Sequence, residues 1–302
     1  MFKSFGAATL DEPPVTGIVT CVANCAALLG EGPVWVAAEE ALYWLDIKGL
    51  KLFRLRDGGQ VESWDTPFMV GSIAPRARGF VAGTEHGFQL LDRPGGTWQA
   101  IGNPEAARPG YRFNDGKVDR QGRFWAGSMD KAEQEADGRL YRLDADRRWS
   151  AVDRGYSVTN GPAFSPDGSR LYHNDSGRQI VYAFDLAADG GLSHRRVIAS
   201  FGEGQGYPDG MTVDAEGCLW IALWDGWCVR RLSPAGEVLR EVRLPVQRPT
   251  SCAFGGPDLD QLFVTSARIG LDAAALRQQP QAGGLFRLDP GVTGLAERAF
   301  AG

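Results

Sequence analysis

A short hydrophobic segment recurs six times along this chain at a nearly constant interval, and no other feature restricts the fold as strongly. The six segments are residues 42–45, 80–82, 124–126, 171–173, 219–222 and 262–264. Their first residues lie 38 to 48 positions apart, which is close to the length of one four-stranded blade of a β-propeller. The spacing therefore predicts a ring of six similar units.

Each segment is flanked by two further strand-like runs, as a blade requires. The preceding runs mostly open with glycine and cover residues 32–35, 71–74, 116–119, 161–164, 210–214 and, more loosely, 251–254. The following runs cover residues 52–55, 88–91, 140–143, 180–184, 229–232 and 285–288. Helical periodicity is nearly absent apart from residues 271–278, which argues against alternating strands and helices.

We therefore predict an all-β fold, a six-bladed β-propeller that forms a single domain over residues 1–302, with an irregular segment at about residues 1–14. Residues 18–22 precede the first repeat, and we expect them to add a strand to the last blade. This strand would close the ring and leave no sheet edge open.

Composition excludes several classes of partner. The net charge is −5, and acidic and basic residues are mixed without a basic stripe, so we expect no nucleic-acid partner. No run of about 18 apolar residues occurs, so we expect no membrane association, a cytoplasmic location and a monomer or weak oligomer. The five cysteines contain no Cys-x-x-Cys pair and are interpreted as mostly buried free thiols.

Polar residues precede the glycines that open several of the first strands. In a propeller these strands begin at the central channel, so the residues before them share one funnel: Glu31, Val70, Asp115, Asn160, Asp209 and, more loosely, Thr250. Glu31, Asn160 and Asp209 have similar contexts, and buried carboxylates repel one another unless a cation lies between them. Their oxygens suit one divalent ion, namely Ca²⁺, Mg²⁺, Mn²⁺, Fe²⁺ or Zn²⁺. The alternative is that they merely form turns, although Glu is a poor turn former.

Two longer links, residues 129–138 and 267–284, lie between second and third strands. We expect both to overhang the metal mouth as substrate walls or lids, the alternative being variable surface loops. The sequence does not favour histidine-based chemistry, because it has only three histidines and none of them shows His-x-x-x-His spacing. His173 is interpreted as a strand residue whose hydrogen bonds are satisfied.

The chain resembles the SMP-30/gluconolactonase/regucalcin family from about residue 21 to residue 302. The stretches that carry the resemblance are GEGP (30–33), RFNDGKVD (112–119), GRFWAGSM (122–129), TNGP (159–162), PDGM (208–211), TSCAFGG (250–256) and LRQQPQAGGLF (276–286). Within the family the chain looks more like the bacterial sugar-acid lactonases, including xylonolactonases, than like a vertebrate calcium regulator. The resemblance implies a six-bladed propeller.

The resemblance also assigns roles to individual residues. It implies that Glu31, Asn160 and Asp209 bind the metal, and that Arg112 and Asn114 contact the substrate. The repeat alone points to Asp115 in place of Asn114. A family carboxylate after the GSM-like stretch falls at Glu133, which we take as a third substrate contact.

We therefore expect metal-dependent hydrolysis of a sugar lactone, such as xylono- or gluconolactone, to the open sugar acid. Asp209 would serve as both ligand and general base. Three alternatives remain: a non-catalytic metal- or sugar-binding regulatory propeller, an esterase or organophosphatase on the same scaffold, and a protein-interaction scaffold. The Trp-Asp signature of the last class is missing.

Overall fold

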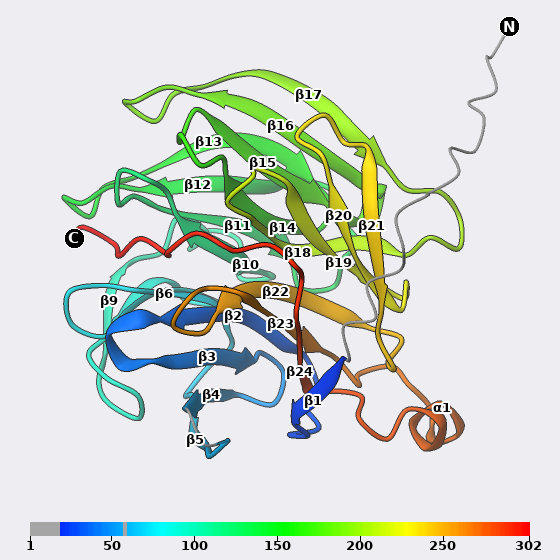
Figure 1. Ribbon diagram of the computed structural model, residues 1–302. Coiled ribbons are helices and arrows are strands. Elements are labelled where there is room, and N and C mark those ends of the chain that lie inside the picture. The colour runs from blue at the N-terminus through cyan, green and yellow to red at the C-terminus, as the bar shows by residue number, and fades with distance from the viewer. Residues whose placement is uncertain (1–18, 57–58) are drawn as a thin grey trace, which may run out of the picture.

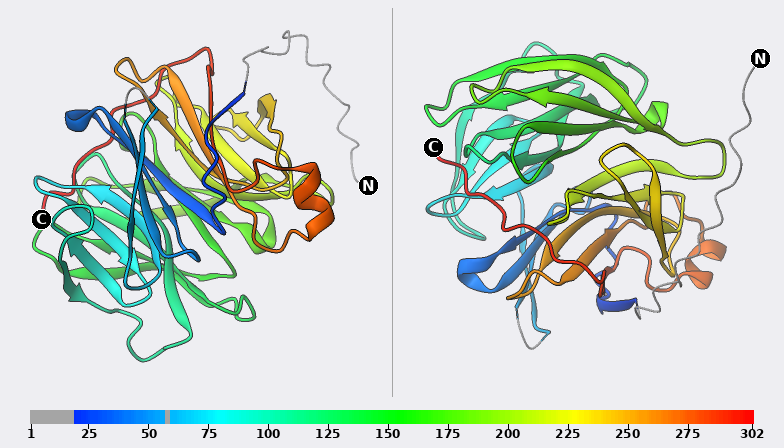
Figure 2. Two further views of the ribbon diagram at one scale, coloured as in Figure 1. Left: turned by 90° about the horizontal axis from the view of Figure 1, so that it is seen from below. Right: turned by 45° about the horizontal axis from the view of Figure 1, so that its top comes forward.

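The computed structural model describes residues 19–56 and 59–302, and within them six four-stranded antiparallel sheets stand around a common centre (Figures 1 and 2). The predicted all-β, six-bladed β-propeller is confirmed. Among the described residues, helix is confined to α1 (Ala273–Gln278) and two short 3₁₀ turns, Ala37–Glu39 and Ser176–Arg178. The segment at about residues 1–14, expected to be irregular, lies outside the described residues.

In five blades the strands follow chain order from the centre outward, and in the sixth the outermost strand comes from the beginning of the described chain. The innermost strands are β2 (Gly30–Val36), β6 (Val70–Pro75), β10 (Tyr111–Val118), β14 (Thr159–Phe164), β18 (Tyr207–Val213) and β22 (Pro249–Gly255). The second strands are β3 (Ala41–Asp46), β7 (Phe80–Thr84), β11 (Phe124–Asp130), β15 (Arg170–Asp175), β19 (Leu219–Trp224) and β23 (Gln261–Ser266). The third strands are β4 (Lys51–Arg56), β8 (Gly87–Leu91), β12 (Gly138–Leu143), β16 (Ile180–Leu186), β20 (Cys228–Leu232) and β24 (Leu285–Leu288).

The outermost strands are β5 (Val61–Asp65), β9 (Trp98–Gly102), β13 (Trp149–Tyr156), β17 (Leu192–Ser200), β21 (Val238–Arg243) and β1 (Thr20–Ala23). Strand β1 comes from the beginning of the described chain and pairs antiparallel with β24 of the last blade, with Thr20 opposite Arg287. The predicted closure of the ring is confirmed for residues 20–22, and the strand extends to Ala23. Ile18 lies outside the described residues.

The second strands are buried on both faces, because the sheets of neighbouring blades pack against each other. Every residue of β3, β7 and β11 is buried. Clusters of apolar side chains fill the space between adjacent blades, and Trp125 of β11 contacts Phe164 of β14 with ring centroids 5.9 Å apart. This double burial explains why these strands read as continuous hydrophobic runs in the sequence.

Every innermost strand carries one extra residue near its start. Glu31 pairs with Leu45 and Val34 pairs with Tyr43, so β2 advances three residues where β3 advances two. The other blades show the same one-residue irregularity at Val70/Ser72, Phe113/Gly116, Asn160/Ala163, Pro208/Met211 and Pro249/Ser251. Such β-bulges bend a strand and redirect its side chains. Here they lie at the mouth of the channel, where the predicted site residues begin.

His173 of β15 differs from its prediction. It lies in a strand, as expected, and is completely buried, but neither ring nitrogen has a hydrogen-bond partner among the described residues. Its ring instead packs against Tyr156, with centroids 4.5 Å apart. The interpretation of His173 as hydrogen-bonded was therefore wrong, because the aromatic packing of this blade surrounds the ring with carbon.

The other predictions concern cysteines and membrane spans. All five cysteines are free; Cys218, Cys228 and Cys252 are buried, while Cys21 and Cys25 are partly exposed. A search of residues 19–56 and 59–302 finds no helix with the length and apolar character needed to cross a membrane.

Candidate active site

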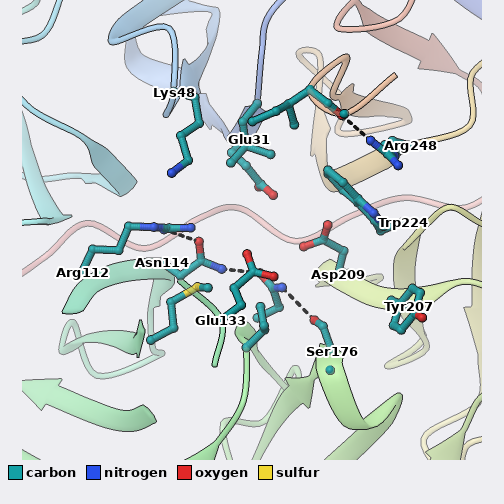
Figure 3. Close-up of a pocket in the computed structure, with 17 residues that line it drawn as sticks. Glu31, Lys48, Arg112, Asn114, Glu133, Ser176, Tyr207, Asp209, Trp224 and Arg248 are labelled. Atoms are coloured by element: carbon teal, nitrogen blue, oxygen red, sulfur yellow. Dashed lines mark hydrogen bonds between the residues drawn. The ribbon is translucent and has the colours of Figure 1, made fainter. Parts of the chain in front are cut away.

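A cavity of about 520 Å³ opens where the innermost strands begin (Figure 3). Its lining combines carboxylates, amides, cations and aromatic side chains from several blades. The lining residues are Leu29, Glu31, Lys48, Arg112, Asn114, Met129, Glu133, Val158, Asn160, Ser176, Gly177, Tyr207, Asp209, Trp224, Arg248, Ile269 and Gly270. All six residues to which the family resemblance assigned a role are among them, namely Glu31, Arg112, Asn114, Glu133, Asn160 and Asp209.

Glu31, Asn160 and Asp209 come from the innermost strands β2, β14 and β18, and each is at most 6% exposed. Burial and the nearby charge of Asp115 raise the pKa of Glu31 to about 8. Burial and the charge of Glu31 raise the pKa of Asp209 well above its ordinary value. Neither carboxyl group forms an ion pair with a described residue within 4.0 Å, so the ionised pair would have no direct countercharge in the pocket.

A hydrogen-bond network fixes the orientation of the Asn160 amide. The Asn160 Nδ2 donates to Ser176 Oγ at 2.8 Å, and Ser176 Oγ donates to the Pro208 carbonyl oxygen at 2.5 Å. Because the serine hydroxyl has one hydrogen, it must accept from Asn160, which turns the Asn160 Oδ1 the other way. That oxygen accepts from Asn114 Nδ2 at 2.8 Å and keeps a second lone pair.

The residues present fit a divalent cation. Two buried carboxylates without a cationic partner, together with an oriented amide oxygen, form a hard oxygen donor set of the kind such ions prefer. Across the part of the chain that the structure describes, no three His, Cys, Asp or Glu side chains are grouped to hold a metal. A site here therefore depends on the Asn160 amide as its third ligand.

Asp115 does not line this cavity, although the repeat pattern pointed to it. It is 8% exposed, and its carboxylate accepts from the backbone N–H groups of Gly116 and Gly161, at 2.8 and 3.0 Å. It thereby joins β10 to β14, and burial raises its pKa to about 6.

The reason lies in the bulges. The repeat pattern matched Gly116 with Gly210, and so Asp115 with Asp209. In the strand pairing, however, the last paired residues before the bulge are Phe113 in β10 and Pro208 in β18. The residues that follow them, Asn114 and Asp209, therefore correspond to each other. The repeat-based expectation for Asp115 was therefore wrong by one residue. Glu31 and Asn160 are themselves the last paired residues before the bulge in their strands, whereas Asp209 is the first residue after it. The three residues therefore do not occupy strictly matching positions.

Arg112 is held beside this network. It is 5% exposed, and its Nη1 donates to Asn114 Oδ1 at 2.6 Å and to the Phe113 carbonyl at 3.0 Å. Its Nε is buried and has no hydrogen-bond partner among the described residues. The Asn114 Nδ2 donates to both Asn160 Oδ1 and the Thr159 carbonyl, which uses both of its hydrogens.

The two long links reach the pocket as expected. Met129 and Glu133 line it from the β11–β12 link, and Ile269 and Gly270 line it from the β23–β24 link that carries α1. Glu133 has a φ of 57° and follows a turn whose backbone N–H groups donate to Asp130. Both segments therefore overhang the mouth of the channel.

Sequence reasoning missed several lining residues, among them Lys48, Ser176, Tyr207, Trp224 and Arg248. A signal for two of them was present. Lys48 and Ser176 lie in links between second and third strands, and those links share the face on which the first strands begin. The prediction that such links reach the pocket named only the two longest of them, although short links lie on the same face.

Comparison with known proteins agrees with this geometry. A family model described as SMP-30/Gluconolactonase/LRE-like region matches residues 29–268. The 6-deoxy-6-sulfogluconolactonase of Pseudomonas putida is 40% identical over 286 residues, which cover 93% of this chain and 98% of that protein. Regucalcin of Danio rerio is 39% identical over 291 residues, covering 94% and 98%.

Among solved structures, a calcium-binding protein, regucalcin, from Agrobacterium tumefaciens superposes with a TM-score of 0.88 at 29% identity, covering 93% of this chain and 96% of that one. The fold and the pocket together define a six-bladed propeller with a carboxylate and amide site at the mouth of its channel. The chain belongs to the SMP-30/gluconolactonase/LRE-like family.

Proposed function

We propose that this protein is a metal-dependent hydrolase that opens a sugar lactone to its sugar acid. The observation that carries the proposal is the buried pair Glu31 and Asp209, which has no cationic partner within ion-pair distance and lies with the Asn160 amide in a cavity large enough for a sugar. The likeness to the 6-deoxy-6-sulfogluconolactonase of Pseudomonas putida supports lactone hydrolysis. Gluconolactone and xylonolactone are the first substrates to test.

In this mechanism Glu31, Asn160 and Asp209 would hold one divalent cation. Such an ion, when bound, polarises an ester carbonyl and lowers the pKa of water. Asp209 accepts the proton of the attacking water as general base. Water adds to the carbonyl carbon, the ring C–O bond breaks, and the proton returns to the leaving oxygen as a hydroxyl group.

The remaining polar residues bind and orient the substrate. Arg112 offers the N–H groups of its Nη2, which donates to no described residue, to a sugar hydroxyl or to the oxygen on which negative charge develops, because its Nε is buried. Asn114 donates both of its amide hydrogens to Thr159 and Asn160, so its role toward the substrate is to orient these neighbours. Glu133, on the overhanging link, accepts from a sugar hydroxyl.

The test is a hydrolysis assay on a panel of aldonolactones, with simple carboxylic esters and a phosphotriester included. We expect lactones to be hydrolysed, activity to disappear after complete removal of metal, and activity to return when one of Ca²⁺, Mg²⁺, Mn²⁺, Fe²⁺ or Zn²⁺ is restored. Metal content is measured on the same samples. Full activity in protein shown to be metal-free would refute the metal role.

A second candidate is a calcium-binding protein without catalysis, which the likeness to the calcium-binding regucalcin of Agrobacterium tumefaciens favours. The same samples separate the two. Tight calcium binding without turnover of any lactone, ester or phosphotriester would support the binding protein and reject the hydrolase.

A further inference from the structure

Lys48 is held at the rim of the pocket by a rigid turn between β3 and β4. The Asp46 carboxylate accepts from the backbone N–H groups of Leu28, Leu29 and Gly49 at 2.8 to 3.0 Å. A Cβ atom at Gly49 would approach Asp46 to 2.2 Å, so the turn is tightly packed around that carboxylate. The Lys48 backbone is therefore fixed, while its side chain is free to extend into the pocket.

Lys48 forms no ion pair with a carboxylate of the residues that the structure describes. Other cations around the mouth do have such partners: Lys131 lies 3.7 Å from Glu85, and Arg248 lies 2.7 Å from Asp225. No hydrogen bond or ion pair joins the Lys48 ammonium to residues 19–56 or 59–302. The positive charge thus faces the pocket without a fixed partner.

A second cation faces the same part of the cavity. Figure 3 shows the side chains of Lys48 and Arg112 on one side of the pocket, directed toward each other, with Asp209 and Tyr207 on the other side. Arg112 also lacks a carboxylate within ion-pair distance among the described residues, and its buried Nε has no acceptor. After burial, the nearby charge of Arg112 lowers the pKa of Lys48, while the charges of Glu133 and Glu85 oppose this shift.

The charge of the whole lining points the same way. The three acidic side chains of the lining, Glu31, Glu133 and Asp209, equal its three cationic side chains, Lys48, Arg112 and Arg248, in number. A divalent ion on the carboxylate side would leave a net charge of +2, with two unpartnered cations across the cavity. Such an arrangement attracts an anion and discriminates against neutral ligands.

We propose that Lys48 and Arg112 form a subsite for an anionic substituent, so that the lactone this pocket takes carries a carboxylate, sulfonate or phosphate group remote from its ester carbonyl. The inference rests on the proposed lactonase function and specifies its substrate class. Lys48 is the specificity-determining residue, because Arg112 can also serve a neutral sugar. The two cations would bind the substituent through charge-assisted hydrogen bonds.

The test compares kcat/KM for glucono-1,5-lactone with the values for counterparts that bear a carboxylate, a sulfonate or a phosphate at carbon 6. The variants are Lys48→Gln, Lys48→Arg and the matched control Lys131→Gln, whose lysine lies outside the lining. We expect the native protein to prefer at least one anionic lactone by about 10-fold or more. Lys48→Gln should reduce that preference about 10-fold, mainly through a higher KM, since the substituent is remote from the reacting bond.

Lys48→Arg and Lys131→Gln should keep the preference, and raising the salt concentration should reduce it in the native protein. Equal or better turnover of the neutral lactone would overturn the subsite while leaving the lactonase function intact. An equal loss on neutral and anionic substrates in Lys48→Gln would do the same. Failure to hydrolyse any lactone would refute the proposed function, and the subsite with it.

Discussion

Asp209 and Asp115 are both buried acidic residues of innermost strands, yet they differ in what their carboxylates reach. Asp209 lines the large cavity, whereas Asp115 accepts from two backbone N–H groups between blades. Asp209→Asn should lower kcat by about 100-fold or more, because an amide cannot accept the proton of water. Asp115→Asn should change kcat by less than about 10-fold, because Asp115 does not line the cavity and affects the site only through its charge, which raises the pKa of Glu31.

Thermal unfolding of both variants checks that they are folded. For Asp115→Asn the loss of one acceptor, which costs about 1–3 kcal/mol, opposes the relief of a buried negative charge. A 100-fold loss of kcat in well-folded Asp115→Asn would contradict the division of roles between the two aspartates.

His173 predicts how stability depends on pH. Burial lowers its pKa to about 3 from its ordinary value of 6.5, so between these values the unfolded chain binds a proton that the folded protein excludes. Stability should therefore fall as the pH falls from about 6.5 toward 3. His173→Phe should remove this loss and gain about 2 kcal/mol over the native protein at about pH 5.

Urea unfolding of the native protein and of His173→Phe, measured from about pH 7 to pH 4, tests this difference in unfolding free energy. His194→Gln is the control, because His194 is exposed and borders Asp185 at 2.9 Å. Parallel stability curves for the native protein and His173→Phe would contradict the assignment of acid sensitivity to this ring.

At the scale of elements, Ser176 shows how a link within one blade orients the ligand of that blade and joins it to the next blade. It lies in the link between β15 and β16, and its hydroxyl joins Asn160 of β14 to the Pro208 carbonyl of β18. Ser176→Ala should weaken metal binding about 10- to 100-fold, since the Asn160 amide loses the partner that sets its orientation. Calorimetric titration of metal into metal-free protein measures this change.

Ser193→Ala is the matched control, because Ser193 is exposed in β17 at the outer edge of the same blade. Unchanged metal affinity in Ser176→Ala would mean that the network does not position the ligand.

The strands differ in how well the sequence predicted them. The first three of each blade were found because they are apolar or open with glycine, as β3 and β19 are. The outermost strands other than β1 were not: β5 alternates between exposed and half-buried residues, and β17 has no buried residue. A strand with one neighbour and one solvated side needs no apolar run, so its pairing with the third strand is decided in three dimensions.

At the scale of the whole molecule, the C-terminal segment ties blades together on the side away from the pocket (Figure 1, red). Backbone bonds join Gly294 to Leu259, Thr293 to Ala215, and Phe300 to Pro75. The Phe300 ring is 2% exposed and packs in a core cluster of the second and third blades.

Phe300→Ala should therefore cost about 3–5 kcal/mol of unfolding free energy, while kcat changes little, because the ring lies far from the substrate side. Denaturant unfolding and the lactonase assay test both parts. The exposed neighbour Arg298→Ala should leave stability within about 0.5 kcal/mol. A stability loss as small for Phe300→Ala as for Arg298→Ala would show that the segment does not hold the ring together.

The sequence by itself determined the ring of six blades, its closure by an early strand, and the candidate residues that line one pocket. It could do so because double burial imposes apolar runs and because a propeller brings the starts of its inner strands to one axis. The repeat spacing pointed to Asp115 and the family resemblance to Asn114, and the tertiary structure shows that Asn114 faces the cavity and that Lys48 and Ser176 join it. Those outcomes depend on one-residue bulges and on contacts between blades, which fix where a side chain points and which the spacing of the repeats does not specify.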